Sequence, residues 1–283
     1  MSVTTAPPRV GPTIGERLRF ALSDGAIAAR RNLVQLWRVP TVLVFELIQP
    51  IMFVLLFRYV YQNVFTELLA VDYVLFLMPG IFVQNTIFGS TTTAIGLAED
   101  LKKGIVDRFR SLPMARSAVL VGRTTADLTK NLLLVTMMIA IGYVVGFRFQ
   151  EGIVSAIGVV LLVLSVGLAF SWISAALGLA IKEVEAVQAA SFTWIFPLVF
   201  VSSIFVPVQG MHPVLEAVAR NNPMTHWANL ARYLSIGEIG IVDPNTGVPV
   251  DTFEGLVVKS VLWIVGLLLV FVPLSVRLYR KLT

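Results

Sequence analysis

Long apolar runs constrain this 283-residue chain more than any other feature, because they recur along most of its length. Hydrophobic residues make up 57% of the chain and charged residues only 14%, and the mean hydropathy is +0.83. Soluble domains of this length are far less apolar. Since about 20 apolar residues cross the hydrocarbon core of a bilayer as a helix, we expect an all-α membrane protein.

Six transmembrane helices can be drawn, at about 39–61, 71–97, 128–147, 153–181, 188–206 and 256–276. Residues 1–12 are rich in proline and predict a flexible leader, so a single transmembrane domain would occupy 13–283. Arginines interrupt the first apolar residues, which excludes a cleavable signal peptide. Residues 13–37 alternate apolar and basic side chains, which favours an N-terminal interfacial helix. A soluble helix packed on its own loops is the alternative.

The basic residues predict the orientation. Seven of the 22 Lys and Arg residues fall between Lys102 and Lys130. In the six-span arrangement, all but five of the 22 lie in or beside the segments that face the same side of the membrane as the two termini. Cytoplasmic segments of membrane proteins carry this excess, so we expect a multi-pass membrane protein with both termini cytosolic. Orientation and anionic membrane lipids also account for the net charge of +5, and no nucleic acid partner is expected.

The segment between the second and third spans predicts a cytosolic helix. Leu101, Ile105, Phe109 and Leu112 recur at helical spacing opposite a charged face. The segment is too long and too regular for a simple turn. We expect a short helix lying along the inner membrane surface, where it would be available to a cytosolic partner.

Prolines divide the segment between the fifth and sixth spans into two short helices, at about 213–220 and 224–234. Each is too short to cross a bilayer. Short apolar pieces of this kind, beside a full span, are typical of a re-entrant or interfacial hairpin, here on the external side.

Motifs for catalysis are absent from the sequence. It contains no G-x-x-x-x-G-K-[ST], no H-E-x-x-H and no G-x-S-x-G. The hydroxyls of Ser90 to Thr93 are expected to bond back to helix carbonyls. The two histidines, His212 and His226, have no third metal ligand beside them, and there is no cysteine. We therefore expect no catalytic residue, no metal site and no cofactor in this chain.

Polar residues inside the spans are the better indication of function. Glu46 and Gln49 stand one turn apart in the first span, where a carboxylate must face protein or water. Either Glu46 has a functional role or it is bonded to a neighbouring helix. Gln84 and Asn85 place polar groups along the second span, and small residues in the fourth favour close helix packing.

The order of these parts resembles the membrane subunit of an ATP-binding-cassette exporter of the ABC-2 type, particularly the daunorubicin-resistance branch. Three stretches carry the resemblance, which extends over roughly residues 12–283. They are Glu99-Asp100 through Arg108-Phe109-Arg110-Ser111-Leu112-Pro113-Met114, then Gly146-Phe147-Arg148-Phe149, and Asn222-Pro223-Met224 with Leu230-Ala231-Arg232.

The resemblance implies a separate P-loop ATPase that binds ATP and Mg, and a second copy of the chain or a homologous permease. The ATPase would dock on Glu99, Leu101, Lys102, Ile105, Arg108, Phe109 and Leu112. The translocation path would lie at the subunit interface, lined by Glu46, Gln49, Gln84, Asn85 and Ser191. The external hairpin would contain Pro207, His212, Pro213, Asn222, Pro223 and His226. The cargo would be an amphipathic drug, lipid, glycolipid or polyketide.

A proton-coupled secondary transporter or channel that uses Glu46 is the alternative function. It would work without an ATPase, and it leaves the cytosolic helix unexplained.

Overall fold

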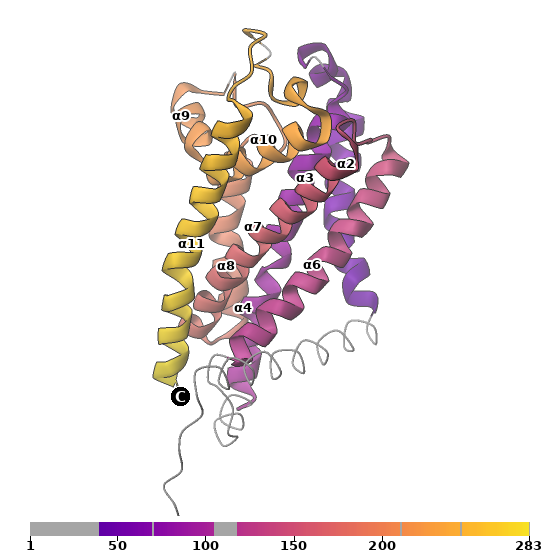
Figure 1. Cartoon of the computed structure of the whole chain (residues 1–283). Coiled ribbons are helices and arrows are strands. Elements are labelled where there is room, and N and C mark those ends of the chain that lie inside the picture. The colour runs from indigo at the N-terminus through magenta and orange to yellow at the C-terminus, as the bar shows by residue number, and fades with distance from the viewer. Residues whose placement is uncertain (1–39, 70, 105–117, 210, 244, 283) are drawn as a thin grey trace, which may run out of the picture.

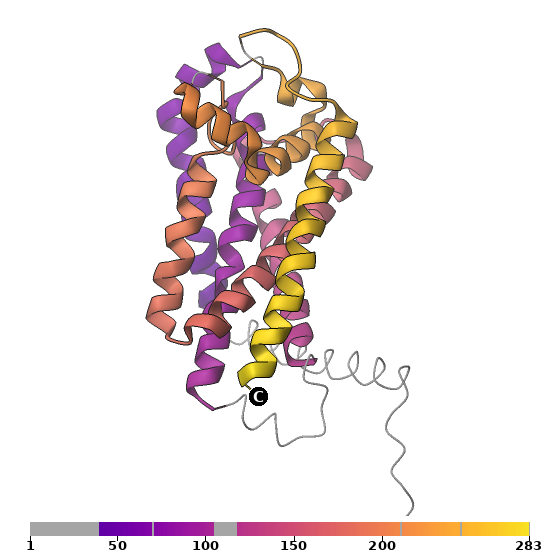
Figure 2. The same cartoon turned by 90° about the vertical axis from the view of Figure 1, so that its left-hand side faces the viewer.

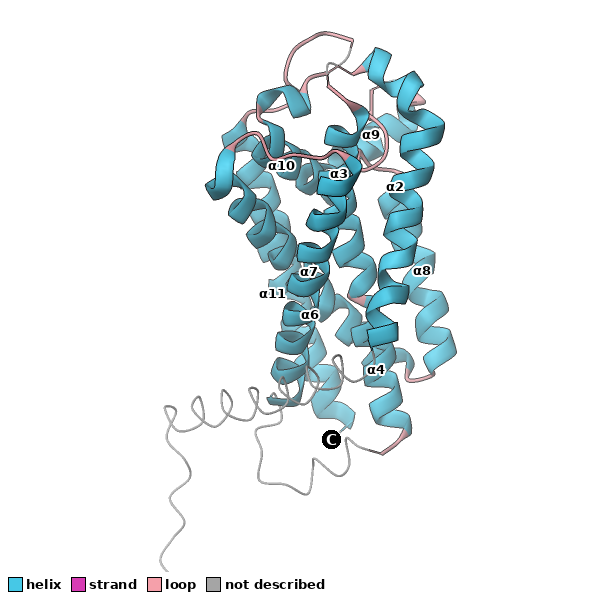
Figure 3. Cartoon of the chain, turned by 90° about the vertical axis from the view of Figure 1, so that its right-hand side faces the viewer, coloured by secondary structure: helices cyan, strands magenta, loops and turns pink. Residues whose placement is uncertain are grey.

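The structure is a computed structural model that describes residues 40–69, 71–104, 118–209, 211–243 and 245–282. The predicted leader, the interfacial helix at 13–37 and most of the predicted cytosolic helix lie outside these residues. The described part is a bundle of helices without a β-strand (Figures 1 and 3). The membrane helices run side by side, and two short helices lie across the end opposite the C-terminus (Figures 1 and 2).

The helices follow the predicted apolar runs. In chain order they are α2 Pro40–Leu68, α3 Tyr73–Gly89, α4 Thr91–Lys102, α6 Ala118–Val145, α7 Gly152–Ile181, α8 Val184–Phe200, α9 Pro213–Asn221, α10 Pro223–Ile236, the 3-10 helix η1 Glu238–Ile241 and α11 Phe253–Leu282.

Five helical segments of the described residues are long and apolar enough to cross a membrane: Val44–Phe65, Tyr73–Lys102, Arg123–Val145, Gly152–Ile181 and Phe253–Lys281. They match five of the six predicted spans. The remaining apolar helix, α8, has 17 residues and ends at Phe200, short of the predicted 206. At 1.5 Å per residue it is about 25 Å long, less than the hydrocarbon thickness of about 30 Å. A sixth crossing therefore stays a prediction.

A break at Ser90 divides the second span into α3 and α4. The hydroxyls of Ser90, Thr91 and Thr92 donate to the carbonyls three residues before them, over 2.6, 2.7 and 2.8 Å. Such bonds compete with the helix ladder and favour bending. The prediction that these hydroxyls bond back to the helix is confirmed for these three residues. Thr93 is different, because its hydroxyl donates to another helix.

The broken helix α3–α4 is the centre of the bundle. Of the residues in its most apolar stretch 89% are buried, against 17% in the corresponding stretches of α2 and α11. Glycine allows α7 to approach closely: a Cβ on Gly178 would lie 2.4 Å from the Ala94 carbonyl oxygen, and one on Gly167 would lie 2.5 Å from Thr86. Small residues in the fourth span thus serve close packing, as predicted.

The short helices α9 and α10 agree with the predicted 213–220 and 224–234 to within two residues. Pro213 and Pro223 begin them, since proline fits the first turn of a helix. Asn222 caps α10 by accepting from the Met224 backbone N–H over 2.9 Å. Its amide also donates to the carbonyls of Leu198 and Val201, at the end of α8. One side chain therefore joins the two short helices to α8.

Arg232 of α10 is fully buried and fixes the short helices on the bundle. Its guanidinium donates to the carbonyls of Phe76, Ser203 and Ile204, and to the side-chain oxygens of Ser203 and Asn229. It also lies 3.6 Å from the centre of the Phe76 ring. Five hydrogen bonds therefore satisfy this buried cation without a carboxylate.

We predict that Arg232→Met lowers the free energy of unfolding by about 3 kcal/mol or more, because several buried carbonyls lose a charged donor at once. Arg220→Met is the matched control, since Arg220 forms an ion pair with Glu216 that is half exposed and should contribute less than about 1 kcal/mol. Thermal unfolding of both variants in detergent measures the difference. Equal midpoints would contradict the assigned role of Arg232.

Candidate functional site

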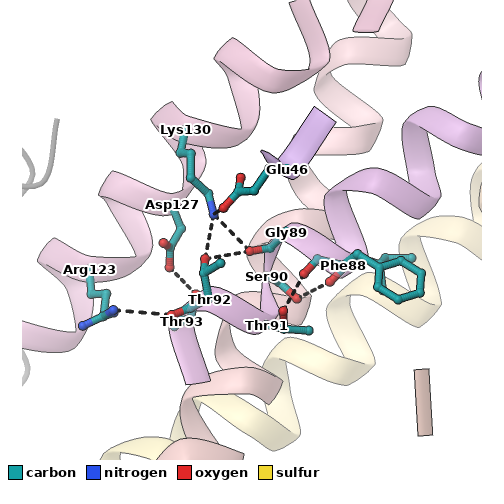
Figure 4. Close-up of polar contacts among 11 residues, drawn as sticks. Glu46, Phe88, Gly89, Ser90, Thr91, Thr92, Thr93, Arg123, Asp127 and Lys130 are labelled. Atoms are coloured by element: carbon teal, nitrogen blue, oxygen red, sulfur yellow. Dashed lines mark hydrogen bonds and ion pairs between the residues drawn. The ribbon is translucent and has the colours of Figure 1, made fainter. Parts of the chain in front are cut away.

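α6 carries a stripe of charged side chains on the face that meets α4 (Figure 4). Arg123, Asp127 and Lys130 recur at intervals of four and three residues, which places them on one side of the helix. Arg123 donates to the Asp100 carboxylate over 2.8 Å, and the Thr93 hydroxyl donates to the Asp127 carboxylate. Because residue numbers rise along α6 while those of its partners fall along α4, the two helices run antiparallel.

Lys130 is the third member of the stripe, and only 7% of its side chain is exposed. Its ammonium donates to Thr92 Oγ1 over 2.6 Å, to Glu46 Oε1 over 3.1 Å and to the Gly89 carbonyl over 3.2 Å. Three donors thus have three acceptors. These belong to α4, α2 and the last residue of α3, so Lys130 joins α6 to all three (Figure 4). We call the contacts of Arg123, Asp127 and Lys130 with α4 the α4–α6 seam.

Glu46 is bonded to a neighbouring helix, which is one of the two alternatives that the sequence left open. Its side chain is 17% exposed, and its ion pair with Lys130 compensates a charge that would be costly in the membrane. The second oxygen, Oε2, is buried and has no partner among the described residues. Sequence reasoning missed Lys130 as the partner, because it counted this lysine with the cytosolic cations. The available signal was its place inside the predicted span 128–147.

The other predicted lining residues are scattered. Gln49 is half buried on α2, whereas Gln84 and Asn85 are buried in α3. Ser191 is buried in α8 and donates to the Val187 carbonyl over 2.8 Å. Within the described residues no hydrogen bond joins these four to one another or to Glu46. Among the described residues, Gln84 Oε1 and Asn85 Nδ2 are buried without a hydrogen-bond partner. Their role in lining a path stays a prediction.

The predicted docking residues are described only at their first end. Leu101 packs beside the apolar cluster of Leu97 and Trp172. Lys102 lies 3.6 Å from Glu183, in the turn between α7 and α8. Glu99 accepts a hydrogen bond from Lys103, which raises the pKa of that lysine. The other predicted docking residues, Ile105, Arg108, Phe109 and Leu112, lie outside the described residues.

The predicted hairpin residues lie at or beside α9 and α10. Pro207 is buried before α9, and His212 is an exposed residue directly before that helix. His226 is half buried in α10. No group of three or more His, Asp or Glu side chains that could hold a metal occurs in the described ranges.

A row of aromatic rings joins α2 to α8, and the sequence analysis did not identify it. Phe57 stacks on Phe205 with ring centres 4.5 Å apart, and Phe200 lies 5.3 Å from the same ring. Phe53 and Phe196 extend the row on either side. Phe196 and Phe200 are 38% and 46% exposed. The spacing of four residues between aromatic side chains on both helices was the available signal.

Comparison with known proteins decides the family. Residues 26–235 match the ABC-2 type transporter family, which is most of the chain. The chain belongs to this family. It is 32% identical to the daunorubicin resistance ABC transporter permease protein DrrB1 of Streptomyces coeruleorubidus, over 99% of both chains. It is 23% identical to a probable doxorubicin resistance ABC transporter permease, DrrC of Mycobacterium tuberculosis, over 93% of this chain and 95% of that one.

A third relative is the putative transport permease ycf38 of Pyropia yezoensis. It is 24% identical over 72% of this chain and 71% of the relative's chain. The chain is therefore an ABC-2 permease, a multi-pass membrane subunit of an ABC transporter. The α4–α6 seam and its contact with α2 lie inside the region that matches the family.

We predict that Lys130→Met lowers the stability of the permease, because Glu46 is left as an unpaired carboxyl inside the bundle. Breaking a buried pair costs about 3–5 kcal/mol, whereas replacing both partners by apolar residues is often neutral. The double variant Glu46→Leu/Lys130→Met should therefore recover most of the lost stability. Thermal unfolding midpoints in detergent test this, and a double variant less stable than the single one would contradict it.

Proposed function

We propose that this permease exports an amphipathic, ring-containing compound, and that a separate subunit hydrolyses the ATP. The observation that carries the proposal is the 32% identity, over 99% of both chains, to a daunorubicin resistance permease. The missing P-loop motif supports the division of labour, since the sequence has no site of that type for nucleotide phosphates. ATP and Mg would bind to the partner.

The partner ATPase would dock at the cytosolic end of α4 and α6, on residues 99–112. Two observations support this location. α4 ends at Lys102 and α6 begins at Ala118, so both helices lead directly into the segment between them. Lys102 also pairs with Glu183, which would connect the docking region to the turn before α8. Movement of the ATPase would in this way reach several membrane helices.

Two permease subunits, either two copies or two homologues, would enclose the path between them. The surface of α2 and α8 suits this role. In the most apolar stretch of α2 only 17% of the residues are buried, and the aromatic row joins α2 to α8. Aromatic faces stack favourably on planar rings. Glu46 and Gln49 would contribute polar groups to the path, with Gln84, Asn85 and Ser191 behind them.

The permease would lie in a bacterial cytoplasmic membrane with both termini in the cytosol. The end of α4 and the C-terminal end of α11 lie at one end of the bundle, and α9 and α10 at the other (Figures 1 and 2). The first end carries basic residues such as Lys102 and Lys281, as cytosolic ends do. α9 exposes Val214, Leu215 and Val218, which supports contact of the hairpin with the outer membrane surface.

We predict that a cysteine at Asn245 reacts with an impermeant thiol reagent only from outside the cell, and a cysteine at Lys102 only from inside. The chain contains no cysteine, so the unsubstituted protein is the background control. Both positions are exposed. Labelling of intact cells and of inverted vesicles measures the two sides. Reaction of both positions from one side would refute this topology.

We predict that Glu46→Gln keeps most of the ATP-driven export of daunorubicin, because glutamine still offers an acceptor oxygen to Lys130. Glu46→Leu should lose much more, since leucine offers none. Uptake of daunorubicin into inverted vesicles that contain the permease and its ATPase, with and without ATP, measures the effect. A proton-coupled carrier would instead fail equally with Gln and Leu. Uptake driven by a pH gradient alone would establish that alternative.

A further inference from the structure

Among the described residues α2 has a single side-chain hydrogen bond or ion pair to the rest of the protein, the contact from Glu46 to Lys130. Elsewhere α2 meets its neighbours through apolar and aromatic packing. Packing of this kind lets one helix slide on another, whereas a hydrogen-bonded ion pair fixes position and direction. Although α2 packs mainly against α3, this contact is therefore the one polar link that fixes α2 directly to α6 among the described residues.

On the other side of the contact, α6 is bonded to α4 by several polar side chains. The α4–α6 seam holds the two helices together at three levels, through Asp100, Thr93 and Thr92 on α4. Gly96 allows α6 to approach α4 closely at this point, because it lies directly against the Arg123 side chain. Hydrogen-bonded ion pairs fix the relative position of two helices, so a movement of α4 is expected to carry α6 with it. The segment on which the ATPase is proposed to dock lies between the end of α4 and the start of α6.

Lys130 stands where this body meets the break in the central helix. It donates to the carbonyl of Gly89, the last residue of α3, and to Thr92 in the first turn of α4. A cation is favourable at the carboxyl end of a helix, where free carbonyls gather. The same ammonium reaches across to Glu46 of α2. A shift of α4 relative to α3 would therefore move the ammonium, and α2 with it.

We propose that Lys130 is a positioning residue for transport, which passes movement of the α4–α6 pair to α2 through Glu46. This inference rests on the proposed function, since it requires an ATPase that moves α4 and α6. The role is distinct from stability. An apolar pair at positions 46 and 130 can pack well inside a membrane protein, but it cannot impose direction on α2.

The double variant Glu46→Leu/Lys130→Met separates the two roles. It should insert and associate with the ATPase as the wild type does, yet the amount of daunorubicin transported per ATP hydrolysed should fall at least about fivefold, the lower end of typical coupling effects. The matched control is Asp251→Leu/Lys259→Met, which removes the partly exposed ion pair between Asp251, just before α11, and Lys259 of α11 and should keep the wild-type ratio. A wild-type ratio in the Glu46/Lys130 variant would overturn the proposal.

A distance measurement tests the same link without a substrate. Spin labels on cysteines introduced at Met52 of α2 and Leu132 of α6, both exposed, should give one narrow distance distribution with and without ATP in the wild type. The double variant should give a broader or shifted distribution in at least one state. Equal distributions in the two proteins would also overturn the proposal. Failure of wild-type vesicles to transport daunorubicin would instead count against the proposed function. The spin-label distances would still test whether the Lys130–Glu46 contact holds α2 to α6.

Discussion

The absence of water from the bilayer core is the constraint on which this structure depends. A polar group inside the membrane must bind another part of the chain or pay a large desolvation cost. The hydroxyls of Ser90, Thr91 and Thr92 bond back to the last carbonyls of α3, and Lys130 finds three acceptors on three helices. Arg232 is satisfied by carbonyls and side-chain oxygens at the end of the bundle. The polar residues thus determine which apolar helices are neighbours.

The parts of the fold that were predictable are those that local chemistry determines. Apolar length located five spans, and Pro213 and Pro223 located the starts of α9 and α10, because proline acts on its own residue and its neighbours. The end of α8 was placed too late. Its apolar residues continue beyond Phe200, but the chain there turns to meet Asn222 and Arg232. A helix end that depends on a distant side chain leaves no trace in a local pattern.

The candidate site shows the same division. Glu46 was identifiable because a carboxylate in an apolar run is conspicuous by itself. Lys130 was also conspicuous inside the predicted span 128–147, but its pairing with Glu46 was not predictable, since this requires knowing which faces of α2 and α6 meet. The aromatic row depends likewise on Phe205, which follows α8 and is brought between α2 and α8 by tertiary structure. Single residues could be nominated from the sequence, whereas their combinations could not.

The unequal lengths of α8 and α11 have a consequence for the surrounding lipid. At 17 and 30 residues, the two helices measure about 25 and 45 Å. No bilayer of uniform thickness matches both. Tilt can accommodate the longer helix, whereas a helix that is too short is accommodated by thinning of the bilayer, by snorkelling of flanking side chains or by oligomerisation. If α8 is the sixth crossing, a thinner bilayer beside α8 than beside α11 would be one such adjustment, and the acyl-chain length of the host membrane would become part of the environment of α8 and its aromatic face.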